Sequence, residues 1–298
     1  MKSIRMILAL ILLALSTAAR AASCQFDEFR VMTYNIRLDV ESDGANRWAN
    51  RRALFTGQVR LLRPDILGMQ EVLPGQRADL VADLPGYLAL GGGRDDGRQA
   101  GEASPLFVAR SRFAVTGSGM FWLSSTPAVP SLGWDAAYRR VATWAHLRRR
   151  SDGMRLLAIN THWDHLGKAA RLGSALQLRG WIMANRRPGE AVVLLGDFNA
   201  PLTEASLQAL LSPPQSRSAL ADSRALSQAP AIGATITFNG WTPIPASGDA
   251  IDHVLVAPGL TVKRYHALAE HFDGRLASDH FPVIADLAPT ACAARPRA

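Results

Sequence analysis

The sequence is poor in cysteine, in lysine and in long apolar runs. Two of its 298 residues are cysteines, Cys24 and Cys292, and their separation does not fit the clustered spacing of a zinc site. Lysine occurs at three positions, and the arginines at 148–150 form too short a block for a nucleic-acid-binding arm. The apolar run at residues 6–15 is too short to cross a bilayer as a helix. We therefore expect no cysteine-based zinc module, no basic tail and no stable membrane span.

The apolar run at residues 6–15 has the features of a secretory signal peptide. Lys2 and Arg5 precede it, and small residues ending at Ala22 follow it. Cleavage there predicts a secreted or periplasmic protein whose residues 23–298 form a single domain. Removing three basic residues lowers the formal net charge from +8 to +5. A basic protein favours anionic partners such as phosphate esters, nucleic acid or anionic lipid, but net charge selects none of them.

The two cysteines leave three alternatives open. In an oxidising compartment Cys24 and Cys292 can form a disulfide, provided that the fold brings their Cα atoms within about 7 Å. Two free buried thiols are the second alternative. A lipid anchor on Cys24 is the third, although the leucine expected at the start of a lipoprotein signal is missing from residues 21–24.

The rest of the composition and its periodicity predict a layered α/β domain. A hydrophobic content of 48% with 19% charged residues excludes general disorder. Helical periodicity predicts helices at residues 48–62 and 168–185. The predicted strands are residues 29–35, 65–70, 105–109, 113–121, 139–147, 156–160, 191–195, 235–238, 251–256 and 281–285. Many strands with few interspersed helices indicate sheets packed on each other.

Polar side chains of metal-binding or acid–base type follow many of these predicted strands. They are Asn35, Glu71, His162, Asp197, Asn199, Asp252, Asp279 and His280. Each one alone has an ordinary explanation as a turn or capping residue. Strands that converge at one edge would gather them into a pocket. Carboxylate and amide oxygens without thiolates suit a hard cation such as Mg²⁺ or Mn²⁺.

Six segments in this order carry a family resemblance. They are Thr33-Tyr34-Asn35-Ile36, Gln70-Glu71, Asn160-Thr161-His162, Gly196-Asp197-Phe198-Asn199, Ile251-Asp252-His253-Val254 and Ser278-Asp279-His280-Phe281-Pro282-Val283. The series resembles the motifs of the endonuclease/exonuclease/phosphatase superfamily, which contains DNase I, and covers about residues 29 to 287. The resemblance implies a DNase I-like, four-layered α/β sandwich of two packed mixed β-sheets flanked by helices. It also implies phosphoester hydrolysis that depends on Mg²⁺ or Mn²⁺.

The resemblance assigns metal binding and water activation to five residues. Glu71 would be the main metal ligand, with Asn35 and Asp279 beside it. Asp197 would orient or deprotonate the attacking water, helped by Asn199. These roles suit the chemistry, because hydrolysis needs an in-line water and stabilisation of charge on the phosphoryl oxygens.

The remaining assigned residues would contact the substrate. His280, held in one tautomer by Asp252, would reach the phosphoryl oxygens or the attacking water, and His162 would donate to the phosphate from the other side. Arg140 is a candidate phosphate contact because a guanidinium can bind two phosphoryl oxygens, with a solvent-facing strand arginine as the alternative. Asn160, in the same motif as His162, is also assigned to substrate binding.

Two other functions remain as alternatives. The segment from His162 to His165 overlaps the second half of the HxHxDH motif of metallo-β-lactamase-like zinc hydrolases, but Asn160 stands where the first histidine is required. Asp164 and His165 are otherwise expected to cap the following helix or to line the pocket rim. A non-catalytic binding protein with the same fold is the second alternative, which the presence of the whole predicted site disfavours.

The substrate is the least determined part of the prediction. We expect a phosphodiesterase acting on a nucleotide, a nucleic acid or another organic phosphodiester. A phosphomonoesterase and a sphingomyelinase-like lipid phosphodiesterase remain open, with residues 241–245 as a weak candidate for membrane docking. The scarcity of lysine argues against inositol polyphosphates. No protein partner is indicated.

Overall fold

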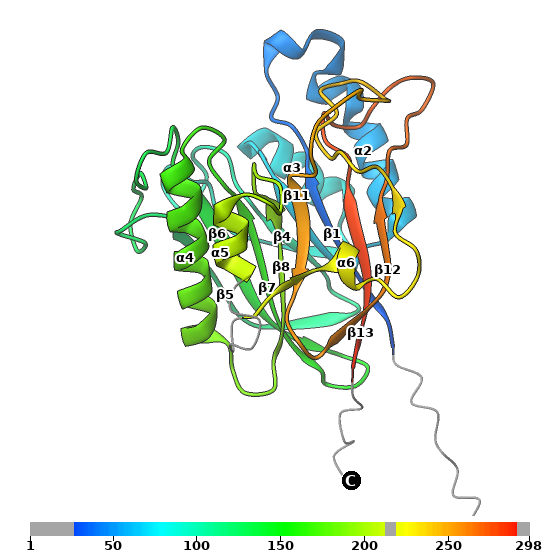
Figure 1. The fold of residues 1–298 in the computed structure, drawn as a ribbon. Coiled ribbons are helices and arrows are strands. Elements are labelled where there is room, and N and C mark those ends of the chain that lie inside the picture. Colours follow the sequence, from blue (N-terminus) through cyan, green and yellow to red (C-terminus); the bar gives the residue numbers. More distant parts are fainter. Residues whose placement is uncertain (1–26, 212–218, 291–298) are drawn as a thin grey trace, which may run out of the picture.

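The computed structural model describes residues 27–211 and 219–290 (Figure 1). The predicted signal peptide and both Cys24 and Cys292 lie outside the described residues, so export, the disulfide and its alternatives stay predictions. Within the described residues, no helix has the length and apolar character needed to cross a membrane.

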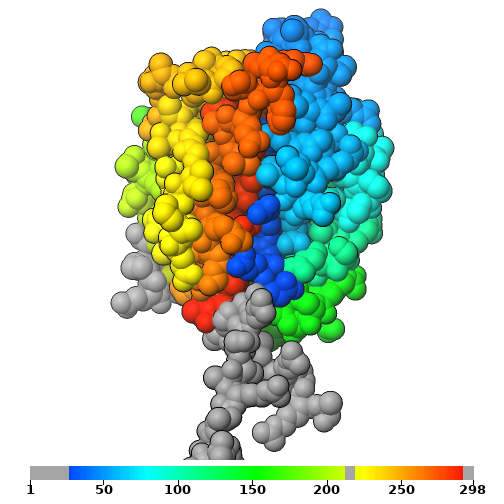
Figure 2. All heavy atoms as spheres, turned by 90° about the vertical axis from the view of Figure 1, so that its right-hand side faces the viewer, coloured from blue at the N-terminus to red at the C-terminus, as the bar shows by residue number. Residues whose placement is uncertain are grey.

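Two mixed sheets form the centre of the fold. The first has seven strands in the order β10 (Ile232–Gly233), β12 (Leu260–Ala267), β13 (Val283–Pro289), β1 (Phe29–Asn35), β2 (Ile66–Gln70), β4 (Leu106–Ala109) and β3 (Tyr87–Leu90). The second has six strands in the order β5 (Phe113–Trp122), β6 (Val141–Arg149), β7 (Arg155–His162), β8 (Ala191–Asp197), β11 (Asp252–Val256) and β9 (Ala221–Asp222). The first and last strands of the described residues pair in the first sheet, where β1 lies beside β13 and the dark blue segment lies against the orange and red ones (Figure 2).

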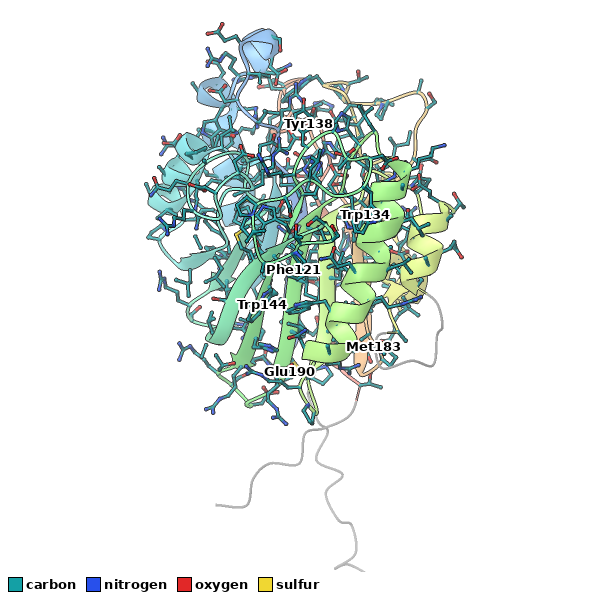
Figure 3. The ribbon with its side chains drawn as sticks, turned by 90° about the vertical axis from the view of Figure 1, so that its left-hand side faces the viewer. Phe121, Trp134, Tyr138, Trp144, Met183 and Glu190 are labelled. Carbon is teal, nitrogen blue, oxygen red and sulfur yellow. The ribbon has the colours of Figure 1, made fainter. Side chains whose placement is uncertain are left out.

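Helices cover the outer face of each sheet. Those on the first sheet are α2 (Trp48–Leu62) and α3 (Pro74–Asp83), preceded by the short 3-10 helix η1 (Glu41–Asn46). Those on the second sheet are α4 (Lys168–Asn185) and α5 (Ala205–Leu211), with the short α6 (Ser223–Leu226) near β9, β11 and β12. Figure 3 shows α4 beside Phe121 and Trp144, whose rings both pack on Trp181 of that helix. The predicted four-layered α/β sandwich is confirmed.

Alternation along the central strands explains the layers. On β1, Val31 faces the core between the sheets, whereas Met32 faces the helices. On β8, Val193 faces the inter-sheet core and Val192 faces α4 and α5. Residues 191–195 of β8 are covered on both faces, which explains the continuous apolar run that predicted this strand.

Most predicted elements are confirmed, but the strand at residues 235–238 is wrong. Only an isolated bridge joins Phe238 to His280 there. The Thr237 hydroxyl oxygen instead accepts hydrogen bonds from the backbone amides of Ile251 and Asp252, at 2.9 and 3.0 Å. This side-chain contact holds the segment as a loop against β11. The prediction also missed α3, α5, β3 and β12, among other short elements.

A polar contact joins the two sheets below the ends of β2 and β7. The Asn160 amide nitrogen donates to Met69 O at 2.7 Å and to Pro105 O at 3.0 Å, and its Oδ1 accepts from Gln70 Nε2 at 2.7 Å. Gly68 leaves the space for this side chain, since a Cβ at Gly68 would lie 2.5 Å from Asn160 Oδ1.

We predict that Gly68→Ala destabilises the protein, because the new methyl group would displace the fully buried Asn160 side chain. The free energy of unfolding should fall by about 1–3 kcal/mol, as overpacking does elsewhere. Gly180→Ala is the matched control: its Cβ would meet nothing within 4 Å on exposed helix α4, so it should gain about 0.5–1 kcal/mol. Urea denaturation measures the free energy of unfolding of both variants. If both variants changed it in the same direction, the packing argument would be contradicted.

Candidate active site

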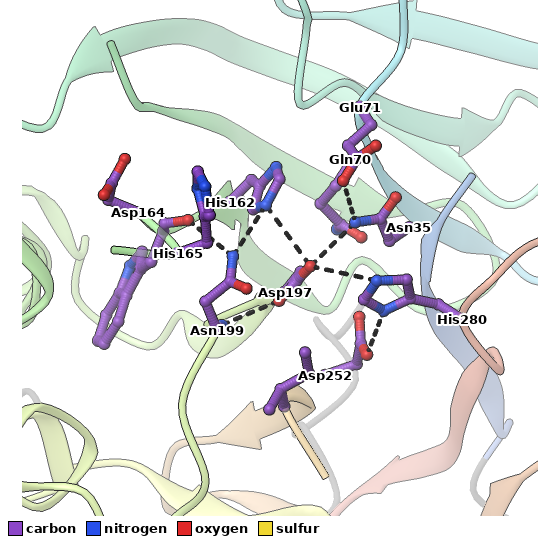
Figure 4. Close-up of polar contacts among 12 residues, drawn as sticks. Asn35, Gln70, Glu71, His162, Asp164, His165, Asp197, Asn199, Asp252 and His280 are labelled. Carbon is purple, nitrogen blue, oxygen red and sulfur yellow. Dashed lines mark hydrogen bonds and ion pairs between the residues drawn. The ribbon is translucent and has the colours of Figure 1, made fainter. Parts of the chain in front are cut away.

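The candidate active site lies where strands of both sheets end at one edge (Figure 4). In the first sheet, parallel pairing aligns the ends of β1 and β2, which carry Asn35 and, one residue beyond β2, Glu71. In the second sheet, His162 of β7 and Asp252 of β11 both pair with Asp197 of β8. Strand register therefore brings together residues that are far apart in the sequence.

Asp279 and His280 reach the same edge from the other end of the chain. They precede β13, which runs antiparallel to β1. The Ser278 hydroxyl donates to Asn35 O at 2.6 Å, and the Asn239 amide donates to Asp279 O at 2.7 Å. These contacts fix the Asp279 segment against the end of β1.

Asn35 connects two carboxylates of the site. Its amide nitrogen donates to Glu71 Oε1 at 3.0 Å and to Asp197 Oδ2 at 2.9 Å, while its Oδ1 accepts from the Arg37 backbone amide. Glu71 Oε2 also accepts from the Leu38 amide at 3.1 Å, and Glu71 has a left-handed backbone with φ of 63°. In this arrangement Asn35 aligns Glu71 with Asp197, and its predicted role as a metal ligand stays a prediction.

The donor set around Glu71 and Asp279 fits a hard divalent cation. Both carboxylates line one pocket, and Arg37 Nε lies 3.7 Å from Asp279 Oδ2. Burial raises the pKa of Asp279, and the negative charge of Glu71 raises it further. A cation between two such oxygen ligands would relieve this repulsion, and oxygen-only donors suit Mg²⁺ or Mn²⁺.

Asp197 is a fully enclosed carboxylate of the site, with 1% of its surface exposed, as for Asp252. Besides Asn35, it accepts from the Asn199 amide at 2.9 Å, and it lies 3.5 Å from His162 Nε2 and 3.8 Å from His280 Nε2. Burial and the nearby charge of Asp252 raise its pKa to about 7. A carboxylate with this pKa can take up a proton at neutral pH, as a general base must.

His280 and Asp252 form a buried hydrogen-bonded pair. His280 Nδ1 lies 2.8 Å from Asp252 Oδ2. Burial alone would lower the pKa of His280, but its contact with Asp252 outweighs burial and holds the pKa well above the usual range. Asp197, Asp252 and His280 also bring ligand atoms within 4.8 Å of one another, so this group could bind a metal ion. His280 Nδ1 faces Asp252, so the Asp252 carboxylate orients His280 Nε2 toward Asp197.

His162 is held in a different protonation state. Burial lowers its pKa well below the usual range, and the positive charges of Arg140 and Arg94 lower it further. Asn199 Nδ2 lies 3.0 Å from His162 Nε2, and Asn199 adopts a left-handed backbone with φ of 49°. The turn after β8 thus aims Asn199 at a neutral imidazole, while His280 remains charged.

Cationic and aromatic side chains close one side of the pocket, whose volume is about 570 Å³. Arg140 is 5% exposed and contacts Asp164 Oδ2 at 3.2 Å, so it is not the solvent-facing arginine of the alternative prediction. Arg94 pairs with Glu102 in the same wall. The Tyr138 ring lies 4.8 Å from the Arg94 guanidinium carbon and 5.8 Å from that of Arg140. The wall therefore offers two guanidinium groups to an anion.

The predicted substrate contact of Asn160 needs correction. Asn160 is fully buried and uses both ends of its amide on the other sheet, so it positions the site from below. Asp164 does not cap α4: its Oδ1 accepts from the amides of Leu166 and Gly167 in the turn before the helix, whereas Asp135 accepts from the first-turn amides of Ala169 and Ala170. His165 lines the pocket. Among the described residues, the zinc-like segment forms no three-ligand group.

Sequence reasoning missed Arg37, Arg94 and Tyr138 as pocket residues. All three lie outside regular strands and helices, where no periodicity or strand-end signal marks them. The left-handed backbone of Arg37, with φ of 57°, gives no sequence signal either.

A buried arginine on α2 supports the site from behind. Arg51 is 1% exposed and donates to the carbonyl oxygens of Ile36, Arg37, Asn46 and Ala277. It thereby joins the segment after Asn35 to the segment before Asp279. Burial lowers the pKa of Arg51 to about 10, so the guanidinium remains charged at neutral pH.

A family model and several solved structures match this chain over most of its length. The Endonuclease/Exonuclease/phosphatase family model matches residues 32–280. An endonuclease/exonuclease/phosphatase family protein from Bacteroides thetaiotaomicron has 34% identity and a TM-score of 0.83, covering 90% of this chain and all of that one. A mannosyl-6-phosphatase from the same species has 35% identity and a TM-score of 0.81, covering 87% and 99%.

A curated relative matches over a shorter stretch. It is the uncharacterized protein L388 of Acanthamoeba polyphaga mimivirus, with 26% identity over 160 residues. The match covers 51% of this chain and 59% of that protein.

We predict that Asp197→Asn stabilises the metal-free protein in a pH-dependent way. Between pH 3.8 and about 7 the folded state keeps a proton on Asp197 that the unfolded state has released, so rising pH weakens the fold. Removing this charge should raise the free energy of unfolding by on the order of 2 kcal/mol at pH 8 and by little near pH 4. Urea denaturation with a chelator measures this, with exposed Asp273→Asn as control. Equal or lower stability at pH 8 would contradict it.

We predict that Arg51→Met strongly destabilises the fold, because it leaves several interior carbonyl oxygens unpaired. The free energy of unfolding should fall by about 3 kcal/mol or more. Arg52→Met, one residue along the same helix, removes a partly exposed arginine paired with Asp79 and Asp83 and should change stability little. Thermal unfolding compares the two, and similar losses would show that Arg51 has no special role.

Proposed function

Because the chain belongs to the endonuclease/exonuclease/phosphatase family, we propose that it hydrolyses the phosphate monoester of a small, sugar-like molecule with a divalent cation. The family acts on phosphoesters, and the observation that carries the finer proposal is the pocket around Asp197. Its volume of about 570 Å³ suits a small molecule, since such sites span roughly 300–1,000 Å³.

With a divalent cation bound, the pocket suits a monoester rather than the diester that the sequence suggested. A phosphate monoester carries close to two negative charges at neutral pH, whereas a diester carries one. Three arginines and the charged His280 line the pocket together with four acids, which are Glu71, Glu102, Asp197 and Asp279. A divalent cation held by Glu71 and Asp279 would add the positive charge that a dianion needs. The relative described as a mannosyl-6-phosphatase, at 35% identity over most of both chains, supports the same choice.

The proposed reaction uses the residues of the two sheet edges in distinct roles. Glu71 and Asp279 would hold a divalent cation, which neutralises charge on the phosphoryl oxygens when bound. Asp197 takes the proton of the attacking water on a carboxylate whose pKa of about 7 suits this task. His280, oriented by Asp252, points Nε2 toward Asp197 and donates a hydrogen bond to a phosphoryl oxygen. As the water oxygen bonds to phosphorus, the bond from phosphorus to the sugar oxygen breaks, and that oxygen takes a proton from solvent water.

The other pocket residues bind the phosphate. Arg94 and Arg140 can each offer two parallel N–H groups to phosphoryl oxygens. Tyr138 packs over both guanidiniums and limits their movement. His162, kept neutral by burial and by the neighbouring arginines, can donate from the ring nitrogen that does not face Asn199.

We predict that the mature protein releases phosphate from mannose 6-phosphate and p-nitrophenyl phosphate at least tenfold faster than it cleaves bis-p-nitrophenyl phosphate. Activity should require Mg²⁺ or Mn²⁺ and disappear in EDTA. Asp197→Ala and His280→Ala should each lower kcat/KM by a factor on the order of 1,000 without unfolding the protein. Exposed His271→Ala is the matched control and should retain activity.

Assays of plasmid DNA, RNA and sphingomyelin complete the test. Faster cleavage of any diester would replace the monoester proposal with phosphodiesterase activity. Near-normal turnover by Asp197→Ala would reject the proposed base. No hydrolysis of any substrate with either metal would contradict the enzyme and favour a binding protein.

A further inference from the structure

A second pocket lies outside the candidate active site. It has a volume of about 860 Å³ and lies between α3, the glycine-rich segment 91–103 and strand β5. It shares no lining residue with the active-site pocket. Nothing in the proposed hydrolysis uses it.

The lining of this second pocket combines apolar walls with positive charge. Val72, Pro74, Val81 and Met120 contribute the apolar surface. Arg77 and Arg98 are its charged lining residues, and none of the lining residues, all within the described part of the chain, is acidic.

Arg77 is the best-placed anion-binding group in the pocket. It is partly buried, and one of its terminal nitrogens donates to Gly91 O. No carboxylate among the described residues pairs with it, and burial lowers its pKa. Arg94, in the neighbouring segment, differs because it lines the active-site pocket and forms an ion pair with Glu102. A partly desolvated guanidinium with unused N–H groups is complementary to a carboxylate, a sulfonate or a phosphate.

A thin wall separates this pocket from the active site. Two isolated bridges, Val72 with Ala103 and Gly93 with Ala103, hold the wall together. Glu71, Arg94 and Glu102, which line the active-site pocket, are sequence neighbours of these three residues. Neighbouring residues of this wall therefore line two separate pockets.

We propose that the second pocket binds an amphipathic organic anion, with its apolar body against Val72, Val81 and Met120 and its charged group on Arg77. Charge complementarity selects this class, because a neutral apolar ligand would leave Arg77 desolvated and unpaired. The proposal concerns a site separate from the hydrolytic one, so it stands whether or not the proposed phosphatase activity is correct.

A pair of fluorescent probes tests the proposal. 1-Anilinonaphthalene-8-sulfonate carries an anionic group, and N-phenyl-1-naphthylamine is its neutral counterpart. We expect the sulfonate to bind the folded protein with 1:1 stoichiometry and octanoate to displace it. Arg77→Met should weaken sulfonate binding at least tenfold and change binding of the neutral probe less than twofold. Arg155→Met, an exposed arginine outside the pocket, should change neither.

A pocket-filling variant locates the bound probe. Ala78 is an exposed residue of α3 that lines the pocket, so Ala78→Trp should fold and block both probes. Unchanged sulfonate binding by Ala78→Trp would place the probe elsewhere and overturn the proposal. Absence of sulfonate binding, or equal affinity of Arg77→Met and the unaltered protein for the sulfonate, would also overturn it.

Discussion

The contact of Asn160 with the opposite sheet is the constraint on which the site depends. Two sheets packed through apolar side chains alone can slide, because the hydrophobic effect has no direction. Asn160 removes this freedom by hydrogen bonding to Met69 O and to Gln70, next to Glu71 in the sequence. Two residues further along β7 lies His162. The same contact therefore fixes the positions of Glu71 and His162 relative to each other along the two strands. Gly68 permits this contact because it has no side chain.

The buried carboxylates at this edge lower the stability of the fold, but they give the site a group that can accept a proton at neutral pH. Asp197, Asp252 and Asp279 are all nearly buried, and burial raises the pKa of Asp197 and Asp279. A fold selected for stability alone would not gather acids here. The rigid sheets resist the repulsion, and His280 offsets part of it. The pKa of Asp197 is thereby held at about 7, where a carboxylate can accept a proton at neutral pH.

Sequence patterns predicted the segments with periodic or continuous apolar residues and the polar residues at strand ends. The alternation along β1 and the apolar run of β8 reflect how the two strands are buried, and the polar residues at their ends mark the site. The pocket wall gave no such signal, because Arg94 and Tyr138 lie on irregular segments whose positions only tertiary contacts determine. The β-branched run at residues 235–238 misled for a related reason: Thr237 uses its hydroxyl to bond β11, and strand propensity cannot foresee that contact.

Strands carry the groups proposed to act in hydrolysis, whereas loops carry most of the residues that would contact the rest of a ligand. Asp197, Asp252 and His162 lie on strands that cannot move independently, so the groups proposed to act in hydrolysis keep their geometry. The surfaces that meet the rest of a ligand come largely from segment 91–103 and the segment before β6. Gly97 and Gly101, with φ of 73° and 77°, let segment 91–103 turn tightly enough to present Arg94 to one pocket and its backbone to the other. Changes in this segment would therefore alter which ligands bind, while the hydrolytic groups on the sheets remain in place.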